Sequence, residues 1–132
     1  MSAHAINIRI YYEDTDFSGN VYHAAYLKFF ERARTEFLRD LDVHHSELAG
    51  QGLAFAVRAM TLDFQAAARI DDVLTVTTDV VEVTGARLVL DQTISREDRV
   101  VTKAQVTVVA IKMGGGATRL PAYLRARLRP GA

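Results

Sequence analysis

A change of hydrophobic period near residue 20 constrains the fold more than any other feature of the sequence. Ile6, Ile8 and Ile10 alternate with polar residues, which places them on one face of a β-strand. After the turn-forming run 16–20, apolar side chains recur every three or four residues, as on one face of an amphipathic helix. This stripe consists of Tyr22, Tyr26, Phe29, Phe30, Ala33, Phe37 and Leu41.

We expect the helix to begin between Asn20 and His23, with Asn20 as its N-cap, and to end near Asp40. A further helical turn closes at Gly50, and a short terminal helix begins at Pro121. Between these two points the chain is rich in β-branched residues and broken by tight turns. The expected strands span residues 54–64, 73–83, 87–95 and 100–113.

The aromatic face of the helix must be buried against another element, and so must the apolar face of an antiparallel sheet. A sheet curled around the helix satisfies both requirements, so the sequence predicts an α+β architecture. The chain has 132 residues and shows no internal repeat, low-complexity tract or linker. We therefore expect a single domain over residues 1–132.

The composition argues against several classes of function. Sixteen basic side chains balance sixteen acidic ones, so the basic surface typical of nucleic-acid binding is missing. No segment reaches the roughly 18 apolar residues of a membrane span, and the N-terminus lacks a signal-peptide pattern. We expect a cytoplasmic protein without membrane insertion. The lack of cysteine excludes thiol nucleophiles, disulfides and Cys-ligated zinc.

Two carboxylates precede the predicted helix. Asp14 and Asp16 are two residues apart, so in an extended chain they point the same way. In one interpretation they cap the helix and compensate its dipole. In the other, Asp16 faces a carbonyl whose oxygen accepts from the unpaired N–H groups of the first helical turn. A thioester suits so small a site, because its leaving thiol, with a pKa of about 8.5, needs little help from a general acid.

The histidines do not predict a metal centre. His23 stands near the expected helix start, where either a packed or a catalytic role is possible. His44 and His45 are adjacent and would diverge on a helix. Asp14, Asp16 and His23 cannot supply a closed set of four ligands, so we expect no metal site.

The run Tyr11–Tyr26 reads Tyr-Tyr-Glu-Asp-Thr-Asp-x-x-Gly-x-Val-Tyr-His-x-x-Tyr and is followed by Phe-Phe-Glu-Arg-Ala-Arg-Thr-Glu over 29–36. It closely resembles the hotdog-fold acyl-CoA thioesterases. The chain looks most like the 4-hydroxybenzoyl-CoA thioesterase group and its Tol–Pal-associated bacterial members. The resemblance continues through Phe64–Asp72, where Ala67 stands in place of a proline usual in the family.

The resemblance implies a hotdog fold, with a five- or six-stranded antiparallel sheet wrapped around one long central helix. It also implies a homodimer formed by joining sheets edge to edge, often assembled further into a homotetramer, with active sites at the dimer interface. The expected activity is hydrolysis of an acyl-CoA thioester to a free carboxylic acid and CoA. No cofactor is expected, because CoA is part of the substrate.

The family's catalytic aspartate falls on Asp16, as nucleophile or general base. The backbone N–H that polarises the thioester carbonyl falls on His23, whose side chain is a further catalytic candidate. Gly19, Val21 and Tyr22 are the neighbouring candidates for oxyanion or substrate binding. An alternative function is a non-catalytic hotdog module that binds an acyl thioester or a partner in an envelope-associated complex.

The sequence leaves the details of substrate recognition open. Aromatic side chains available to an acyl pocket are Phe17, Tyr22, Phe55 and Phe64, and any of them may equally belong to the core. Basic side chains available to the CoA phosphates are Arg69, Arg87, Lys103, Lys112, Arg125, Arg127 and Arg129.

Overall fold

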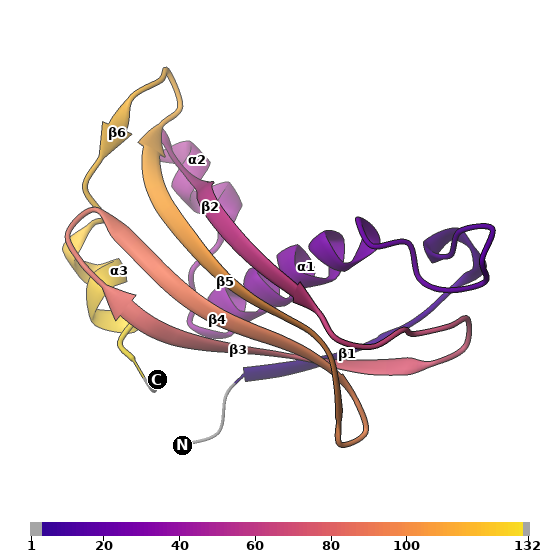
Figure 1. Ribbon diagram of the computed structural model, residues 1–132. Helices are drawn as coiled ribbons and strands as arrows, with labels where there is room; N and C mark the ends of the chain where they lie inside the picture. Colours follow the sequence, from indigo (N-terminus) through magenta and orange to yellow (C-terminus); the bar gives the residue numbers. More distant parts are fainter. Residues whose placement is uncertain (1–3, 131–132) are drawn as a thin grey trace.

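A curved antiparallel sheet and one long helix form the body of the computed structural model, which describes residues 4–130 (Figure 1). The sheet has six strands in the order β1-β3-β4-β5-β2, with β6 paired to β5 beyond the end of β4. Their bounds are β1 His4–Arg9, β2 Leu53–Phe64, β3 Val73–Val83, β4 Arg87–Arg96, β5 Arg99–Lys112 and β6 Ala117–Thr118. The helices are η1 Tyr12–Asp14, α1 Ala25–Asp40, α2 His45–Gly50 and α3 Ala122–Arg127.

The predicted α+β fold is confirmed. The four strands expected after the helix lie within one residue of their predicted bounds, and the short helices α2 and α3 lie where the sequence placed them. The outermost residues of the expected domain, 1–3 and 131–132, are outside the described range. Among residues 4–130, no helix combines the length and the apolar content needed to cross a membrane.

Helix α1 lies against the concave face of the sheet (Figure 1), and the stripe residues on it belong to the buried core. The prediction is wrong for Tyr22, which precedes α1 and is exposed. Phe29, Phe30 and Ala33 are fully buried, and Tyr26 and Phe37 are nearly so. They meet the inward-facing side chains of the central strands, which alternate along each strand as predicted. The inward set includes Leu74, Val76, Val80, Leu88, Leu90, Ile94, Val106 and Val108.

The helix begins later than the sequence predicted. α1 starts at Ala25, its N-cap is Ala24, and no side chain caps it. The predicted N-cap, Asn20, is wrong, because Asn20 instead pairs with Arg69 in an isolated β-bridge. Backbone pairing with a distant loop therefore takes residues that local propensity would assign to the first helical turn.

A buried glutamine connects α1 to the middle of the sheet. Gln92 of β4 is 1% exposed, and its Nε2 donates to the Phe30 carbonyl and to Thr78 Oγ1, both at 3.0 Å. Its Oε1 accepts from Arg34 Nη1 at 2.9 Å. The side-chain amide is therefore satisfied on both ends, and it fixes the position of α1 along the strands.

Strand β2 forms one edge of the sheet. It is twelve residues long, it pairs with β5 on one side, and a register shift between Val57 and Ala59 marks a bulge. Val57 and Phe64 are large apolar side chains exposed along it. A long apolar edge without a neighbour is a template for pairing with another strand.

We predict that Gln92→Leu lowers the free energy of unfolding by about 1–3 kcal/mol, because it leaves buried polar groups without their partner. Gln105→Leu on β5 is the matched control: this glutamine is exposed and bonds only Asp91, so its loss should change stability by less than about 0.5 kcal/mol. Urea unfolding followed by circular dichroism measures both. Equal midpoints for the two variants would contradict the anchoring role.

Candidate active site

Asp16 lies in a tight hairpin formed by residues 15–21. Thr15 and Val21 pair as an antiparallel bridge, and the Asp16 N–H donates to the Asn20 carbonyl at 3.0 Å. The Gly19 N–H donates back to the Asp16 carbonyl at 3.0 Å, and Gly19 has a φ of +85°. This matches a three-residue hairpin loop that ends on a left-handed residue. A Cβ at Gly19 would meet no atom within 4 Å, so glycine is favoured here for its backbone angle and not for space.

The two carboxylates play different parts. The extended backbone expected for this segment is wrong at Asp14, which closes the short helix η1. Asp14 Oδ2 accepts from the Tyr11 N–H at 2.9 Å, so Asp14 caps η1 and not α1. Asp16 is exposed, and its Oδ1 accepts from both the N–H and the hydroxyl of Ser18, at 2.8 and 2.5 Å.

The hairpin keeps Asp16 ionised. The Ser18 hydroxyl and then the Ser18 N–H hold the pKa of Asp16 below its ordinary value, because both donors favour the charged form. A slight burial penalty acts in the opposite direction, and the nearby His23 adds a small further lowering of the pKa. Oδ2 accepts no hydrogen bond from the part of the chain that is described, so one carboxylate oxygen is left for other chemistry.

Two adjacent backbone donors lie just before α1. The N–H groups of Val21 and Tyr22 donate to the carbonyls of Ala68 and Asp14, at 2.8 and 2.9 Å. As candidate oxyanion donors these two amides are therefore already occupied. The N–H groups of His23 and Ala24 donate to no acceptor among residues 4–130. The first available donor is thus His23, the residue that the resemblance indicates.

Aromatic side chains surround this segment. The His23 ring makes edge contacts with Tyr22 and Phe64, at centroid distances of 4.7 and 6.1 Å. Phe64 ends strand β2, so His23 lies beside the open edge of the sheet. The exposed large side chains of this region are Tyr11, Tyr12, Phe17, Tyr22 and Phe64, and Phe17 is fully exposed. Exposed apolar patches are typical of surfaces that bind another molecule.

The loop 65–72 supports the hairpin from the other side, a part that reasoning from the sequence missed. Arg69 pairs with Asn20, and its N–H donates to Asp72 Oδ2 at 2.9 Å. Arg96 Nη1 donates to the same oxygen at 3.0 Å. Burial alone would raise the pKa of Asp72, but these donors outweigh it and lower the pKa. The adjacent carboxylates Asp71 and Asp72, just before strand β3, were the available signal in the sequence.

Within a single chain the site is an open surface. Three cavities in the described part of the chain have volumes of about 590, 690 and 370 Å³, and neither Asp16 nor His23 lines any of them. In the described range, no three His, Cys, Asp or Glu side chains gather as metal ligands.

The tail arginines lie far from Asp16 in the same chain. Arg127 Nη1 donates to the Asp42 carbonyl, just past the C-terminal end of α1, whereas the hairpin precedes the N-terminal end. The two ends of this 16-residue helix are about 24 Å apart. Arg69 is the basic residue that contacts the hairpin directly.

An antiparallel sheet curled around one long helix is the hotdog architecture. The sequence profile of the thioesterase-like superfamily matches residues 11–128, so the chain belongs to this family and is a thioesterase. Acyl-CoA thioesterase YbgC of Haemophilus influenzae is 47% identical over 108 residues, 81% of this chain and 79% of that relative. Acyl-CoA thioester hydrolase YbgC of Escherichia coli is 44% identical over 105 residues, 79% and 78% of the two chains. A crystal structure of a probable thioesterase from Bartonella henselae has a TM-score of 0.87 at 42% identity, and the match covers 91% of this chain and 100% of that one.

We predict that Gly19→Ala destabilises the chain by roughly 1–2 kcal/mol, because alanine is strained at a φ of +85°. Gly50→Ala is the control: Gly50 ends helix α2, its φ is not positive, and a Cβ there meets nothing within 4 Å. That change should be neutral or mildly stabilising. Urea unfolding distinguishes the two, and a stable Gly19→Ala variant would mean that the hairpin adopts another turn.

We predict that Ser18→Ala raises the pKa of Asp16 toward its ordinary value, since the hydroxyl is the largest cause of the lowering. A carboxylate with a lowered pKa stays ionised to lower pH. Activity that needs the ionised form should therefore begin to fail at a higher pH in the variant. Carboxyl ¹³C NMR measures the change in the pKa of Asp16, and the acidic limb of the pH–rate profile measures the change in the pH at which activity is lost. A limb that does not move would show that the ionisation of Asp16 does not limit the reaction.

Proposed function

We propose that this chain hydrolyses acyl-CoA thioesters to a free acid and CoA, acting as a single hotdog domain over residues 1–132 without a cofactor or metal. The names of the Haemophilus and Escherichia relatives support the acyl-CoA substrate. The single observation that carries the mechanism is the pairing of an ionised carboxylate on the hairpin with two available N–H donors at the start of α1. The proposed compartment is the cytoplasm.

In the proposed reaction the thioester oxygen accepts from the N–H groups of His23 and Ala24, which immediately precede α1 and have no acceptor among residues 4–130. These donors stabilise the negative charge that develops on the oxygen. Asp16 either attacks the carbonyl carbon or removes a proton from the attacking water. If Asp16 attacks, the CoA thiolate leaves and a mixed anhydride remains, which water then hydrolyses to the free acid, restoring the Asp16 carboxylate. If Asp16 is the base, the water oxygen bonds to the carbonyl carbon, the CoA thiolate leaves and takes up the proton, and the free acid is the other product. The His23 side chain, exposed between Tyr22 and Phe64, is placed to help position that water.

We propose that a second copy of the chain completes the site. The hairpin lines none of the three cavities described above, and its aromatic side chains are exposed. The open edge of β2 ends at Phe64, which touches His23. A partner strand paired there would cover the aromatic surface and enclose Asp16. The resulting assembly is a homodimer or a homotetramer, which sedimentation velocity distinguishes from a monomer.

We predict that Asp16→Asn lowers the rate of thiol release from acyl-CoA by about 100-fold or more, because the proposed nucleophile or base is removed. The matched control is Asp14→Asn. An asparagine oxygen at position 14 still accepts from the Tyr11 N–H, so activity and stability should change little. An Asp16→Asn variant that folds and turns over at the wild-type rate would refute the mechanism.

The His23→Ala variant separates the side chain from the main chain at this position. It keeps the backbone N–H, so a loss of only a few-fold assigns His23 to carbonyl polarisation, and a loss as large as that of Asp16→Asn assigns the ring to the chemistry. The same thiol-release assay tests the alternative function. A binding module would take up CoA esters, detected by calorimetry, without releasing free CoA.

A further inference from the structure

An ion pair anchored on strand β4 closes the turn 69–72. Arg96 Nη1 donates to Asp72 Oδ2 at 3.0 Å and to the Ala67 carbonyl at 3.5 Å. The Arg69 N–H donates to the same Asp72 oxygen at 2.9 Å, and the Asp72 N–H donates back to the Arg69 carbonyl at 3.1 Å. A single carboxylate oxygen therefore connects the sheet to both ends of the turn.

The same stretch of chain holds the hairpin. Arg69 pairs with Asn20 in an isolated β-bridge, and the next residue of the hairpin, Val21, donates its N–H to the Ala68 carbonyl at 2.8 Å. Asn20 and Val21 lie in the chain between the Asp16 carboxylate and the free N–H groups that precede α1. The position of the turn therefore affects how far the carboxylate lies from those N–H groups.

The backbone of the turn needs to be held from outside. Asp71 has a φ of +72°, in the left-handed region that favours glycine. Two backbone bonds fix one side of the turn, because the Asp71 N–H donates to the Ile10 carbonyl at 2.9 Å and the Ile10 N–H donates to the Asp72 carbonyl at 2.8 Å. The Asp72 side chain fixes the other side, and Arg96 holds that side chain in place.

The ion pair also lies close to the first turn of α1. Tyr26, the second residue of the helix, is 4% exposed. Burial raises the pKa of its phenol, the Ala68 backbone and the Arg96 charge act in the opposite direction, and the Asp72 charge adds to the rise. Both members of the ion pair are thus within electrostatic range of the helix start.

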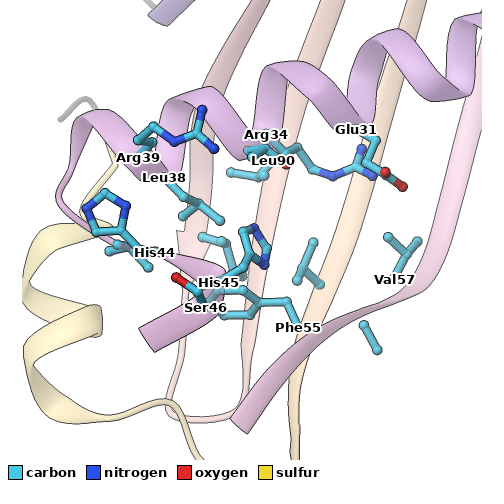
Figure 2. A pocket seen from close by; sticks show the side chains of 15 residues that line it. Glu31, Arg34, Leu38, Arg39, His44, His45, Ser46, Phe55, Val57 and Leu90 are labelled. Carbon is cyan, nitrogen blue, oxygen red and sulfur yellow. The ribbon is translucent and has the colours of Figure 1, made fainter. Parts of the chain in front are cut away.

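The second half of α1 is held in a different way. Arg34 lines the cavity of about 590 Å³ between α1, α2 and β2 (Figure 2), and it donates to the buried Gln92 at 2.9 Å. Arg34 lies nine residues beyond the start of α1, about 14 Å along the helix axis. No side chain among residues 4–130 caps α1. The bond to Gln92 therefore fixes the helix on the sheet, and the segment before the helix depends on the loop.

We propose that Arg96 is a positioning residue for the reaction. Acting through Asp72, it fixes the loop that holds the hairpin. The loop in turn keeps the N–H groups of His23 and Ala24 at a fixed distance from the Asp16 carboxylate. This inference rests on the proposed hydrolysis, in which those N–H groups polarise the thioester carbonyl. Small displacements of such groups affect the chemical step more than they affect substrate binding.

The test compares Arg96→Met with Arg96→Lys, using the acyl-CoA that the wild type hydrolyses fastest. In Arg96→Met we expect kcat for thiol release to fall about 5- to 50-fold, with KM changed less than about threefold. Both contacts of Arg96 come from one nitrogen, Nη1, so a lysine ammonium can make them. Arg96→Lys should therefore recover kcat to within about threefold of the wild type. A lysine variant as slow as the methionine variant would overturn the proposal.

Arg99→Met is the matched control. Arg99 is the cross-strand neighbour of Arg96, it is exposed, and it forms no ion pair within the described residues. Its replacement removes the same charge from the same turn and should change kcat less than about twofold. A loss in Arg99→Met equal to that in Arg96→Met would assign the effect to surface charge and refute the positioning role.

The amide ¹H and ¹⁵N chemical shifts of His23 and Ala24 report on the donors without any substrate. They should move in Arg96→Met and return in Arg96→Lys. A folded Arg96→Met variant with unmoved shifts would refute the proposal, whatever its rate. If the wild type releases no thiol from any acyl-CoA, the proposed hydrolysis fails, and the shifts still decide whether Arg96 positions the two amides.

If Arg96→Met does not fold, Asp72→Asn takes its place. The asparagine oxygen still accepts from the Arg69 N–H, but the charge that holds Arg96 is lost. We expect the same fall in kcat and the same movement of the amide shifts. Asp71→Asn is its control, because asparagine tolerates a positive φ and the Asp71 side chain forms no ion pair within the described residues. Wild-type kcat in Asp72→Asn would overturn the proposal.

Discussion

The packing of the aromatic face of α1 against the concave face of the sheet is the interaction on which the rest of the structure depends. A 16-residue helix is only marginally stable by itself in water, and a sheet with one apolar face cannot stand uncovered. Phe29 and Phe30 are fully buried, and each such side chain contributes about 1.5–3 kcal/mol. Non-directional burial of this kind holds the layers together but leaves the helix free to slide. The directional bonds of Gln92 to Phe30, Thr78 and Arg34 remove that freedom.

The position of the start of α1 follows from this anchoring. The hairpin and the helix start are connected by backbone bonds, so the donors at His23 and Ala24 are held by the fold and not by their own side chains. Such preorganised donors need no rearrangement when charge develops on a substrate oxygen. The same segment is open to solvent in one chain. If a second copy encloses it, the activity will depend on protein concentration, because dilution separates the two halves of the site.

Much of this fold can be read from the sequence, because its strands and its helix have clear and different periods. The strand 73–83 was predicted at its observed bounds, and the stripe at Phe29, Phe30 and Ala33 is buried as expected. The helix start was misplaced for a physical reason. Asn20 has a strong local preference for capping, and only a contact with Arg69, 49 positions away, overrides it.

In the candidate site, too, the sequence predicts the features that depend on local residues and misses those that depend on distant contacts. The sequence motif points to Asp16, and its exposed carboxylate and lowered pKa are consistent with that choice. The motif could not show that the amides of Val21 and Tyr22 are occupied, since their acceptors are set by tertiary pairing with Ala68 and by the turn at Asp14. Nor could it show the cavity beside Arg34, which arises where α2 and β2 stand apart from α1.

The Val21 N–H donates to the Ala68 carbonyl, so the position of the loop 65–72 affects the position of the segment just before α1. Ala68 is fully buried, so a bulkier residue there would push this carbonyl outward and carry Val21 with it. Sequence changes in this loop can therefore shift the N–H donors of His23 and Ala24 relative to Asp16, although the loop itself supplies no reacting group.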